Sequence, residues 1–119
     1  MRPDKLQECA HEASVLLKAM SNQHRLLILC QLVPGEKCVG ELVRLVGLSQ
    51  SALSQHLARL RRDNLVRTRR EAQTIYYSIA GAEPLAVLQL LYQLFCSGER
   101  LLDGHEARSS RPIVHLASA

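Results

Sequence analysis

The sequence is poor in aromatic residues and has no tryptophan. Its 119 residues include three tyrosines and one phenylalanine. A core without large rings must be built from Leu, Val, Ile and Ala side chains, and that composition is typical of packed helices. The length suits one domain with a small core. We therefore expect a single, mainly helical domain.

Long apolar runs are also absent. No stretch approaches the roughly 20 apolar residues of a membrane-spanning helix, and the first residues, MRPDKLQECAHE, lack the apolar core of a signal peptide. We expect a cytoplasmic protein with no membrane partner. In that reducing compartment, the four cysteines are expected to be core residues, metal ligands or redox-active thiols rather than a disulfide framework.

Catalytic signatures are missing as well. The sequence has no nucleophile accompanied by a base, no metal-binding triad and no phosphate-binding loop. These absences argue against an enzyme, and we expect no cofactor.

The sequence does contain a helix-turn-helix pattern at residues 39–62. Apolar residues recur at helical spacing in two segments, Val39, Leu42, Val43 and Val46 in the first and Leu53, Leu57 and Leu60 in the second. Between them, Gly47 can adopt the left-handed conformation that ends a helix, and Ser49 can cap the next helix. We expect two short helices joined by a tight turn, as in DNA-binding proteins of this class.

The second of these helices begins with polar side chains that suit DNA. Short or flat hydrogen-bonding side chains can reach base edges in the major groove and the phosphates beside it. We expect this helix to be the recognition helix, with contacts from Gln50, Ser51, Ser54, Gln55 and His56.

A β-hairpin is expected after the recognition helix. Residues with high β-propensity at 66–68 and 74–79 flank the polar tip Arg70-Glu71-Ala72-Gln73. Six of the fifteen Lys and Arg residues lie between 59 and 70, namely Arg59, Arg61, Arg62, Arg67, Arg69 and Arg70. Such clustering is typical of phosphate contacts, with a solvated basic face as the alternative. The DNA contacts expected from this region are Arg59, Arg67, Arg69, Arg70 and Gln73.

Three further helices complete the domain. Asp4 is expected to cap a first helix that runs to about Met20, and a second helix follows Asn22 and stops at Pro34. A last helix begins near Gly81 and ends at about residue 98. The predicted fold class is mainly α with a β-hairpin wing, a winged helix-turn-helix.

The last helix is too apolar for a small monomer. More than one of its faces is covered by Leu85, Val87, Leu88, Leu90, Leu91, Leu94 and Phe95. This excess predicts a homodimer that meets through the first and last helices and binds a palindromic operator in double-stranded DNA. We assign residues 1–103 to the DNA-binding and dimerisation domain, and residues 104–119 to a mobile tail.

The whole pattern resembles a known family. LLKAMSNQHRLLILCQL, GELVRLVGLSQSALSQHLARLRRDNLV and TIYYSI are similar to segments of the ArsR/SmtB bacterial repressors, over roughly residues 10–98. The resemblance implies a dimeric repressor that leaves its operator when an inducer binds. It puts the early polar residues of the recognition helix in the major groove, His56 and Arg59 nearer the DNA backbone, and the wing in or beside the minor groove.

One class of inducer in this family is a metal or metalloid ion. The arsenic and cadmium sensors carry a Cys-x-Cys pair where this chain has Cys38 and then Gly40. Cys9 and His11 on the first helix would have to complete a site with Cys38. The zinc sensors carry an Asp-x-His and a later His on the last helix, which PLAVLQLLYQLFCSGE lacks. Metal sensing is therefore the alternative hypothesis.

The other class of inducer acts on thiols. Cys30 and Cys96 lie near the ends of the second and last helices, where the persulfide-sensing branch of the family (repressors called BigR, SqrR and HlyU) also has two cysteines. The chain resembles that branch in GELxxxxGLSQSALSQHLA as well. The resemblance implies that reactive sulfur species are the inducer and join the two thiols through a di- or polysulfide. A general oxidant sensor and two ordinary core cysteines are the alternatives.

Overall fold

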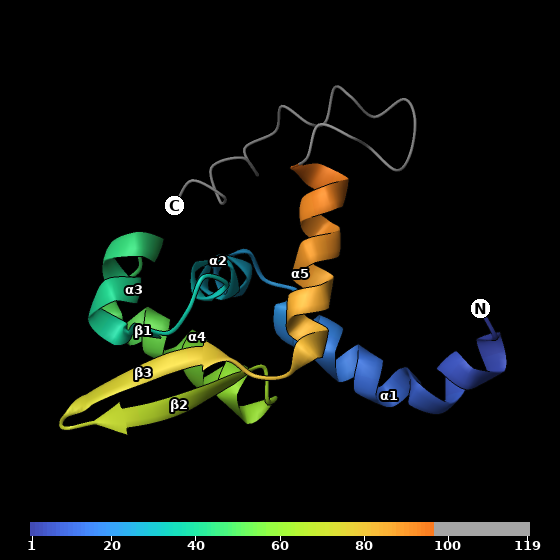
Figure 1. Ribbon diagram of the computed structural model, residues 1–119, viewed down its shortest axis with the longest axis horizontal. Helices are drawn as coiled ribbons and strands as arrows, with labels where there is room; N and C mark the ends of the chain where they lie inside the picture. Colours follow the sequence, from blue (N-terminus) through green and yellow to red (C-terminus); the bar gives the residue numbers. More distant parts are fainter. Residues whose placement is uncertain (97–119) are drawn as a thin grey trace.

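The structure is a computed structural model in which residues 1–96 are described. Its elements are α1 (Pro3–Met20), α2 (Gln23–Leu32), β1 (Lys37–Cys38), α3 (Val39–Val46), α4 (Gln50–Arg62), β2 (Val66–Glu71), β3 (Thr74–Ile79) and α5 (Ala82–Phe95). The hairpin extends at one end of the molecule and α1 reaches away at the other (Figure 1). The predicted winged helix-turn-helix is confirmed, whereas the predicted boundary at 103 and the tail lie outside the described residues.

The turn between α3 and α4 forms as the sequence predicts. Gly47 has a φ of 79°, and its N–H bonds to the Val43 carbonyl at 3.1 Å, which closes α3. The Ser49 hydroxyl accepts a hydrogen bond from the Ala52 N–H at 3.1 Å, which caps α4. These two hydrogen bonds end α3 and begin α4, and so define the turn between them.

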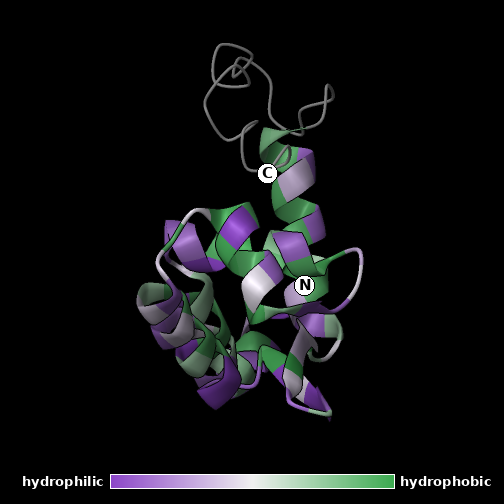
Figure 2. Cartoon of the chain, turned by 90° about the vertical axis from the view of Figure 1, so that its left-hand side faces the viewer, coloured by the Kyte–Doolittle hydropathy of each residue, from purple (hydrophilic) through white to green (hydrophobic). Residues whose placement is uncertain are grey.

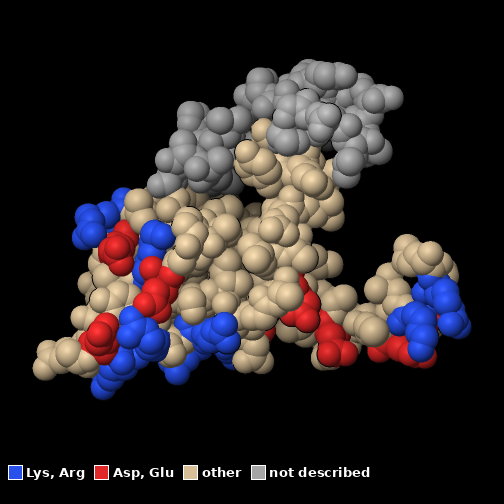
Figure 3. All heavy atoms as spheres, in the orientation of Figure 1, with Lys and Arg blue, Asp and Glu red and all other residues tan. Residues whose placement is uncertain are grey.

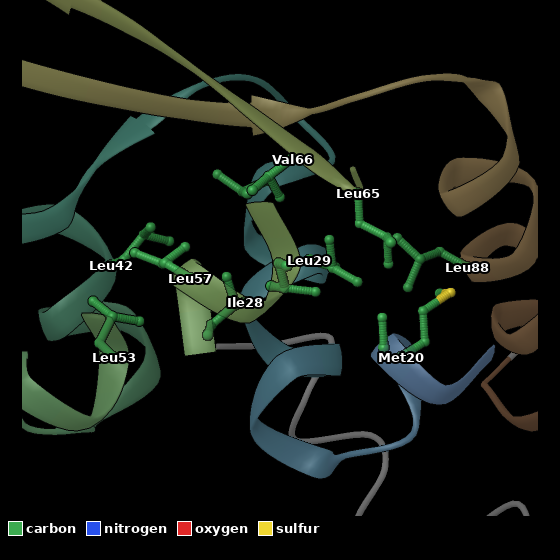
Figure 4. Close-up of a cluster of buried hydrophobic side chains, with 12 residues drawn as sticks. Met20, Ile28, Leu29, Leu42, Leu53, Leu57, Leu65, Val66 and Leu88 are labelled. Atoms are coloured by element: carbon green, nitrogen blue, oxygen red, sulfur yellow. The ribbon is translucent and has the colours of Figure 1, made fainter. Parts of the chain in front are cut away.

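The core is built on the apolar stripe of α4. Leu53, Leu57 and Leu60 are at most 1% exposed. They join a cluster with Ile28 and Leu29 of α2 (Figure 4), completed by Ala19, Met20, Leu32, Leu42, Leu65, Val66 and Leu88. Full burial of each leucine contributes about 1.5 to 3 kcal/mol relative to exposure. The recognition helix is therefore held against α2 and α3 by its own leucines.

The sheet has one strand more than the sequence predicts. The order is β1-β3-β2, and all pairs are antiparallel. β1 has only two residues, Lys37 and Cys38, too few for an alternating pattern to be visible in the sequence. The hairpin register pairs Glu71 with Thr74, so the turn consists of Ala72 and Gln73 alone. The tip is thus shorter than the predicted four residues, because Arg70 and Glu71 belong to β2.

The predicted cap of α1 is wrong. The helix starts at Pro3, since proline fits the first helical turn, and Asp4 lies inside that turn with an ion pair to Arg2 at 2.8 Å. Its end is held by Arg25, whose Nε donates to the Ala19 carbonyl at 2.6 Å.

Within residues 1–96, no helix combines the length and apolarity needed to cross a membrane.

The turn that leads from α4 into the wing depends on Asn64. Its φ of 64° is left-handed, and the Leu65 N–H bonds back to the Leu60 carbonyl at 2.8 Å. This arrangement satisfies the last carbonyls of α4 and directs the chain into β2.

We expect Asn64→Val to lower the free energy of unfolding by about 1 to 2 kcal/mol, because a β-branched side chain is strained at positive φ. Asn64→Gly is the matched control and should retain the wild-type stability, since glycine adopts this conformation without strain. Urea unfolding followed by circular dichroism measures both. Equal losses in the two variants would show that the Asn64 side chain, rather than its backbone conformation, matters.

Candidate nucleic-acid interface

The polar side of α4 faces solvent. Gln50, Ser51, Ser54 and Gln55 are all exposed, opposite or beside the buried leucine stripe. The structure therefore brings together four of the five side chains expected to read DNA, on the free face of one helix. Side chains in this arrangement can enter a major groove without disturbing the core.

His56, the fifth of these residues, points to the other flank of α4. It is half-buried, and its ring centroid lies 5.8 Å from that of His24 at the start of α2. Burial, followed by the charges of Arg25 and His24, lowers the pKa of His56. The imidazole thus tends to stay neutral, at the edge of the exposed polar face rather than within it.

Three of the six clustered arginines are already paired inside the chain. Arg59 binds Asp63 (Nε to Oδ2) at 2.9 Å, and the Nε of Arg62 lies 3.6 Å from the other Asp63 oxygen. The hydrogen bond from Arg59 is the main reason that the pKa of Asp63 is lowered. The carboxylate of Asp63 thus offsets part of the positive charge at the end of α4.

Arg69 is the third paired arginine. Its guanidinium donates to Glu36, ahead of β1, through Nε at 3.2 Å and also through Nη2, and it approaches Glu71 at 3.3 Å. It also lies 4.7 Å from the ring centroid of Tyr76. The hydrogen bonds from Arg69 lower the pKa of Glu36. Arg69 therefore links the wing to the segment before β1, a role that its place in the sequence did not indicate.

The remaining three arginines, Arg61, Arg67 and Arg70, form no ion pair or hydrogen bond within residues 1–96. Arg67 lies on the same face of the hairpin as Arg69, whereas Arg70 lies on the opposite face, because alternate residues of a strand point to opposite sides. Figure 3 shows Lys and Arg atoms gathered over the wing, with acidic atoms among them. The unpaired arginines are the groups most available to phosphates.

Two of the four cysteines influence each other electrostatically, and the other two lie elsewhere in the fold. Cys30 on α2 and Cys96 at the end of α5 are both half-buried. Burial, and then the charge of Cys96, raises the pKa of the Cys30 thiol. The two thiols are therefore near enough to interact electrostatically, although they belong to different helices.

Cys9, His11 and Cys38 are not brought together. Cys9 and His11 are exposed on α1, and Cys38 precedes α3, where its backbone N–H donates to Glu41 Oε1 at 3.0 Å. Across the part of the chain that the structure describes, no three His, Cys, Asp or Glu side chains form a group that could hold a metal ion. The metal-sensing alternative thus has no assembled site within these residues of one chain.

A solvent-facing recognition helix, a wing and unpaired arginines define a winged helix-turn-helix DNA-binding regulator. Residues 22–68 match the family described as "Bacterial regulatory protein, arsR family". The transcriptional activator HlyU of Vibrio cholerae serotype O1 is 50% identical over 100 residues, which span 84% of this chain and 93% of HlyU. The chain belongs to the arsR family.

Solved structures agree with this assignment. Reduced HlyU from Vibrio cholerae N16961 matches with a TM-score of 0.73 and 53% identity over 78% of this chain and 98% of that one. The transcriptional repressor BigR of Xylella fastidiosa matches with a TM-score of 0.78 and 38% identity, over 82% of this chain and 99% of BigR. The homodimeric winged helix-turn-helix domain of Mb0332 from Mycobacterium bovis matches with a TM-score of 0.66 and 30% identity, over 76% of this chain and 83% of that one. The resemblance read from the sequence is confirmed, and so is the expectation of a regulator rather than an enzyme.

Replacement of Gln55 tests whether the exposed face of α4 reads bases. We expect Gln55→Ala to weaken binding to an operator selected from random duplexes by about 1 to 3 kcal/mol, because a base-edge contact is lost. Binding to unselected duplexes should not change, since that binding depends on phosphates. Fluorescence anisotropy with both DNAs measures the difference.

Arg70→Ala is the contrasting variant. It should weaken binding to both DNAs by the same factor. The negative slope of log K against log salt should become less steep by about 0.9, because one phosphate contact is lost. An equal loss on both DNAs in Gln55→Ala would contradict a base-reading role for that side chain.

Proposed function

We propose that the chain is a dimeric transcriptional repressor that leaves a palindromic operator when reactive sulfur species bridge Cys30 and Cys96. The observation that carries the proposal is the placement of two half-buried thiols, one on α2 and one at the C-terminal end of α5, and the charge of Cys96 adds to the burial that raises the pKa of Cys30. α2 packs directly on the recognition helix through Ile28 and Leu29. A bridge would therefore form between the support of the recognition helix and the last helix.

The chemistry needs only the two thiols and a polysulfide. One thiolate attacks a sulfane sulfur, and the shortened polysulfide leaves with the electron pair. The second thiolate then attacks the Sγ atom of the resulting persulfide, and the outer sulfur leaves as hydrosulfide, so that the two thiols have lost their protons and a disulfide remains. If the second cysteine also carries a sulfane sulfur, the first persulfide attacks the Sγ of the second, hydrosulfide leaves, and a bridge with one added sulfur atom forms. Extra sulfur atoms relax the close Cα spacing that a direct disulfide demands.

The apolar surfaces of α1 and α5 support the dimer. The large side chains left at least 40% exposed on these helices are Leu6, Leu17, Leu90, Tyr92 and Phe95. Figure 2 shows apolar residues along α5 where it rises above the other helices. A surface of this kind favours burial against a second copy, and Mb0332 is described as homodimeric.

The descriptions of two relatives support separate parts of this proposal, the redox sensitivity and the repression. A structure of HlyU is described as its reduced form, and BigR is described as a repressor. We propose that this chain acts in the cytoplasm, where its DNA lies. A bridge that shifts α5 at the dimer interface would misplace two recognition helices that must meet half-sites about 34 Å apart.

The two thiols are tested by single substitutions. Cys30→Ser and Cys96→Ser should bind the operator like the wild type when reduced, and should keep it after polysulfide treatment. The wild type should lose about 5- to 150-fold in affinity, the range of typical allosteric couplings. Cys9→Ser and Cys38→Ser are the matched controls and should release DNA like the wild type. Release by either of the first two variants would move the switch to Cys9 and Cys38.

Mass spectrometry of the same samples separates polysulfide from a general oxidant. A bridged species that has lost two protons and gained one or more sulfur atoms, absent from Cys30→Ser, would support persulfide sensing. A disulfide without added sulfur, formed equally by peroxide, would favour the general oxidant sensor. Zinc or arsenite retained in stoichiometric amount would favour the metal alternative.

The dimer is tested by a charge on the apolar side of α5. Leu90→Asp should convert the protein to a monomer in sedimentation experiments, because an unpaired carboxylate is costly to bury. Val33→Asp is the matched control, since Val33 has the same exposed fraction, 47%, at the end of α2. A dimer that survives Leu90→Asp would exclude this part of α5 from the interface.

A further inference from the structure

A groove lies between the recognition helix and the wing. It has a volume of about 430 Å³ and is lined by Ser54, Ala58, Arg61, Arg62 and Tyr77. Ser54, Ala58 and Arg61 fall at positions i, i+4 and i+7, so they form one stripe of α4 beside its buried leucines. The small side chains of Ser54 and Ala58 leave the space that Tyr77 of β3 closes from the other side.

The lining of the groove is suited to an anion. Arg61 forms no ion pair or hydrogen bond with residues 1–96. The Nε of Arg62 lies 3.6 Å from Asp63 Oδ1, a longer ion pair than the one that Arg59 forms with Oδ2 at 2.9 Å. Among the residues that the structure describes, no carboxylate lines the groove. The hydroxyls of Ser54 and Tyr77 add hydrogen-bond donors to the two guanidinium groups.

We propose that this groove binds one phosphate of the DNA backbone, with Arg61 as its main ligand and Ser54 and Tyr77 as supporting donors. The proposal rests on the DNA-binding function and adds a defined site to it, since the sequence placed Arg61 only within a basic cluster and gave Tyr77 no part in DNA binding. A guanidinium matches the geometry of a phosphate because it presents two parallel N–H groups.

The location gives this phosphate a particular role. The groove lies between the recognition helix and the wing, the two elements that a winged helix places against DNA. A DNA strand that contacts both elements would therefore pass over the groove. One phosphate held from both sides fixes the register of the recognition helix relative to the wing. Such a contact carries no sequence information and should strengthen binding to every duplex.

The experiment measures affinity against sodium chloride concentration for a selected operator and a random duplex. Arg61→Ala should weaken binding to both DNAs by the same factor. It should also make the negative slope of log K against log salt less steep by about 0.9, the value for one phosphate contact. Arg2→Ala is the matched control, because it removes an equal charge from the exposed start of α1. It should leave the slope unchanged. Ala58→Glu, at an exposed helical position, should weaken binding at least as much as Arg61→Ala, by repelling the phosphate.

Methylphosphonate substitution identifies the phosphate itself. In each half-site, one neutral linkage should weaken binding of the wild type and have no further effect on Arg61→Ala. An unchanged salt slope in Arg61→Ala overturns the site while leaving DNA binding intact. Saturable binding of inorganic phosphate, seen by NMR without any change in that slope, overturns it in favour of a small-anion site. A wild type that binds no duplex overturns the proposed function and this site together.

Discussion

The packing of α4 on α2 and α3 is the interaction on which the rest of the structure depends. Because Leu53, Leu57 and Leu60 are buried, the rotation of α4 about its axis is fixed. Its polar residues then face solvent, His56 faces α2, and Ser54, Ala58 and Arg61 face the wing. The same α2 carries Cys30. The thiol and the recognition helix are therefore joined through one layer of close-packed side chains, and close-packed interiors transmit displacement.

Ion pairing sets how much positive charge is left for DNA. Asp63 engages Arg59 and Arg62, and Glu36 with Glu71 engages Arg69. These pairs join the end of α4 to the turn that follows it, and the wing to the segment before β1. Within residues 1–96, the clustered arginines left without an internal partner are Arg61, Arg67 and Arg70, which lie on α4 and on both faces of the hairpin. The positions of the few acidic residues therefore decide which arginines stabilise the fold and which are available to phosphates.

Features with local causes were predictable from the sequence. Gly47 and Ser49 act on neighbouring backbone groups, so the helix-turn-helix could be predicted, and the β-forming residues on both sides of a polar tip indicated the hairpin. Features made by distant residues were not readable: Glu36 and Arg69 are 33 positions apart, β1 is too short to show a pattern, and the groove exists only where α4 meets β3. The pairing of Cys30 with Cys96 came from resemblance to the family, and no spacing in the chain would have indicated it.

The central claim is that a bridge between α2 and α5 changes the separation of the two recognition helices. Its most direct test is the distance between spin labels carried by an unnatural amino acid at Ser51 in each protomer, measured by pulsed electron resonance without DNA. The account predicts a defined distance in the reduced dimer and a displaced distribution after polysulfide treatment. The displacement should be absent in Cys96→Ser. A bridged protein that releases DNA with an unchanged distance would contradict the account.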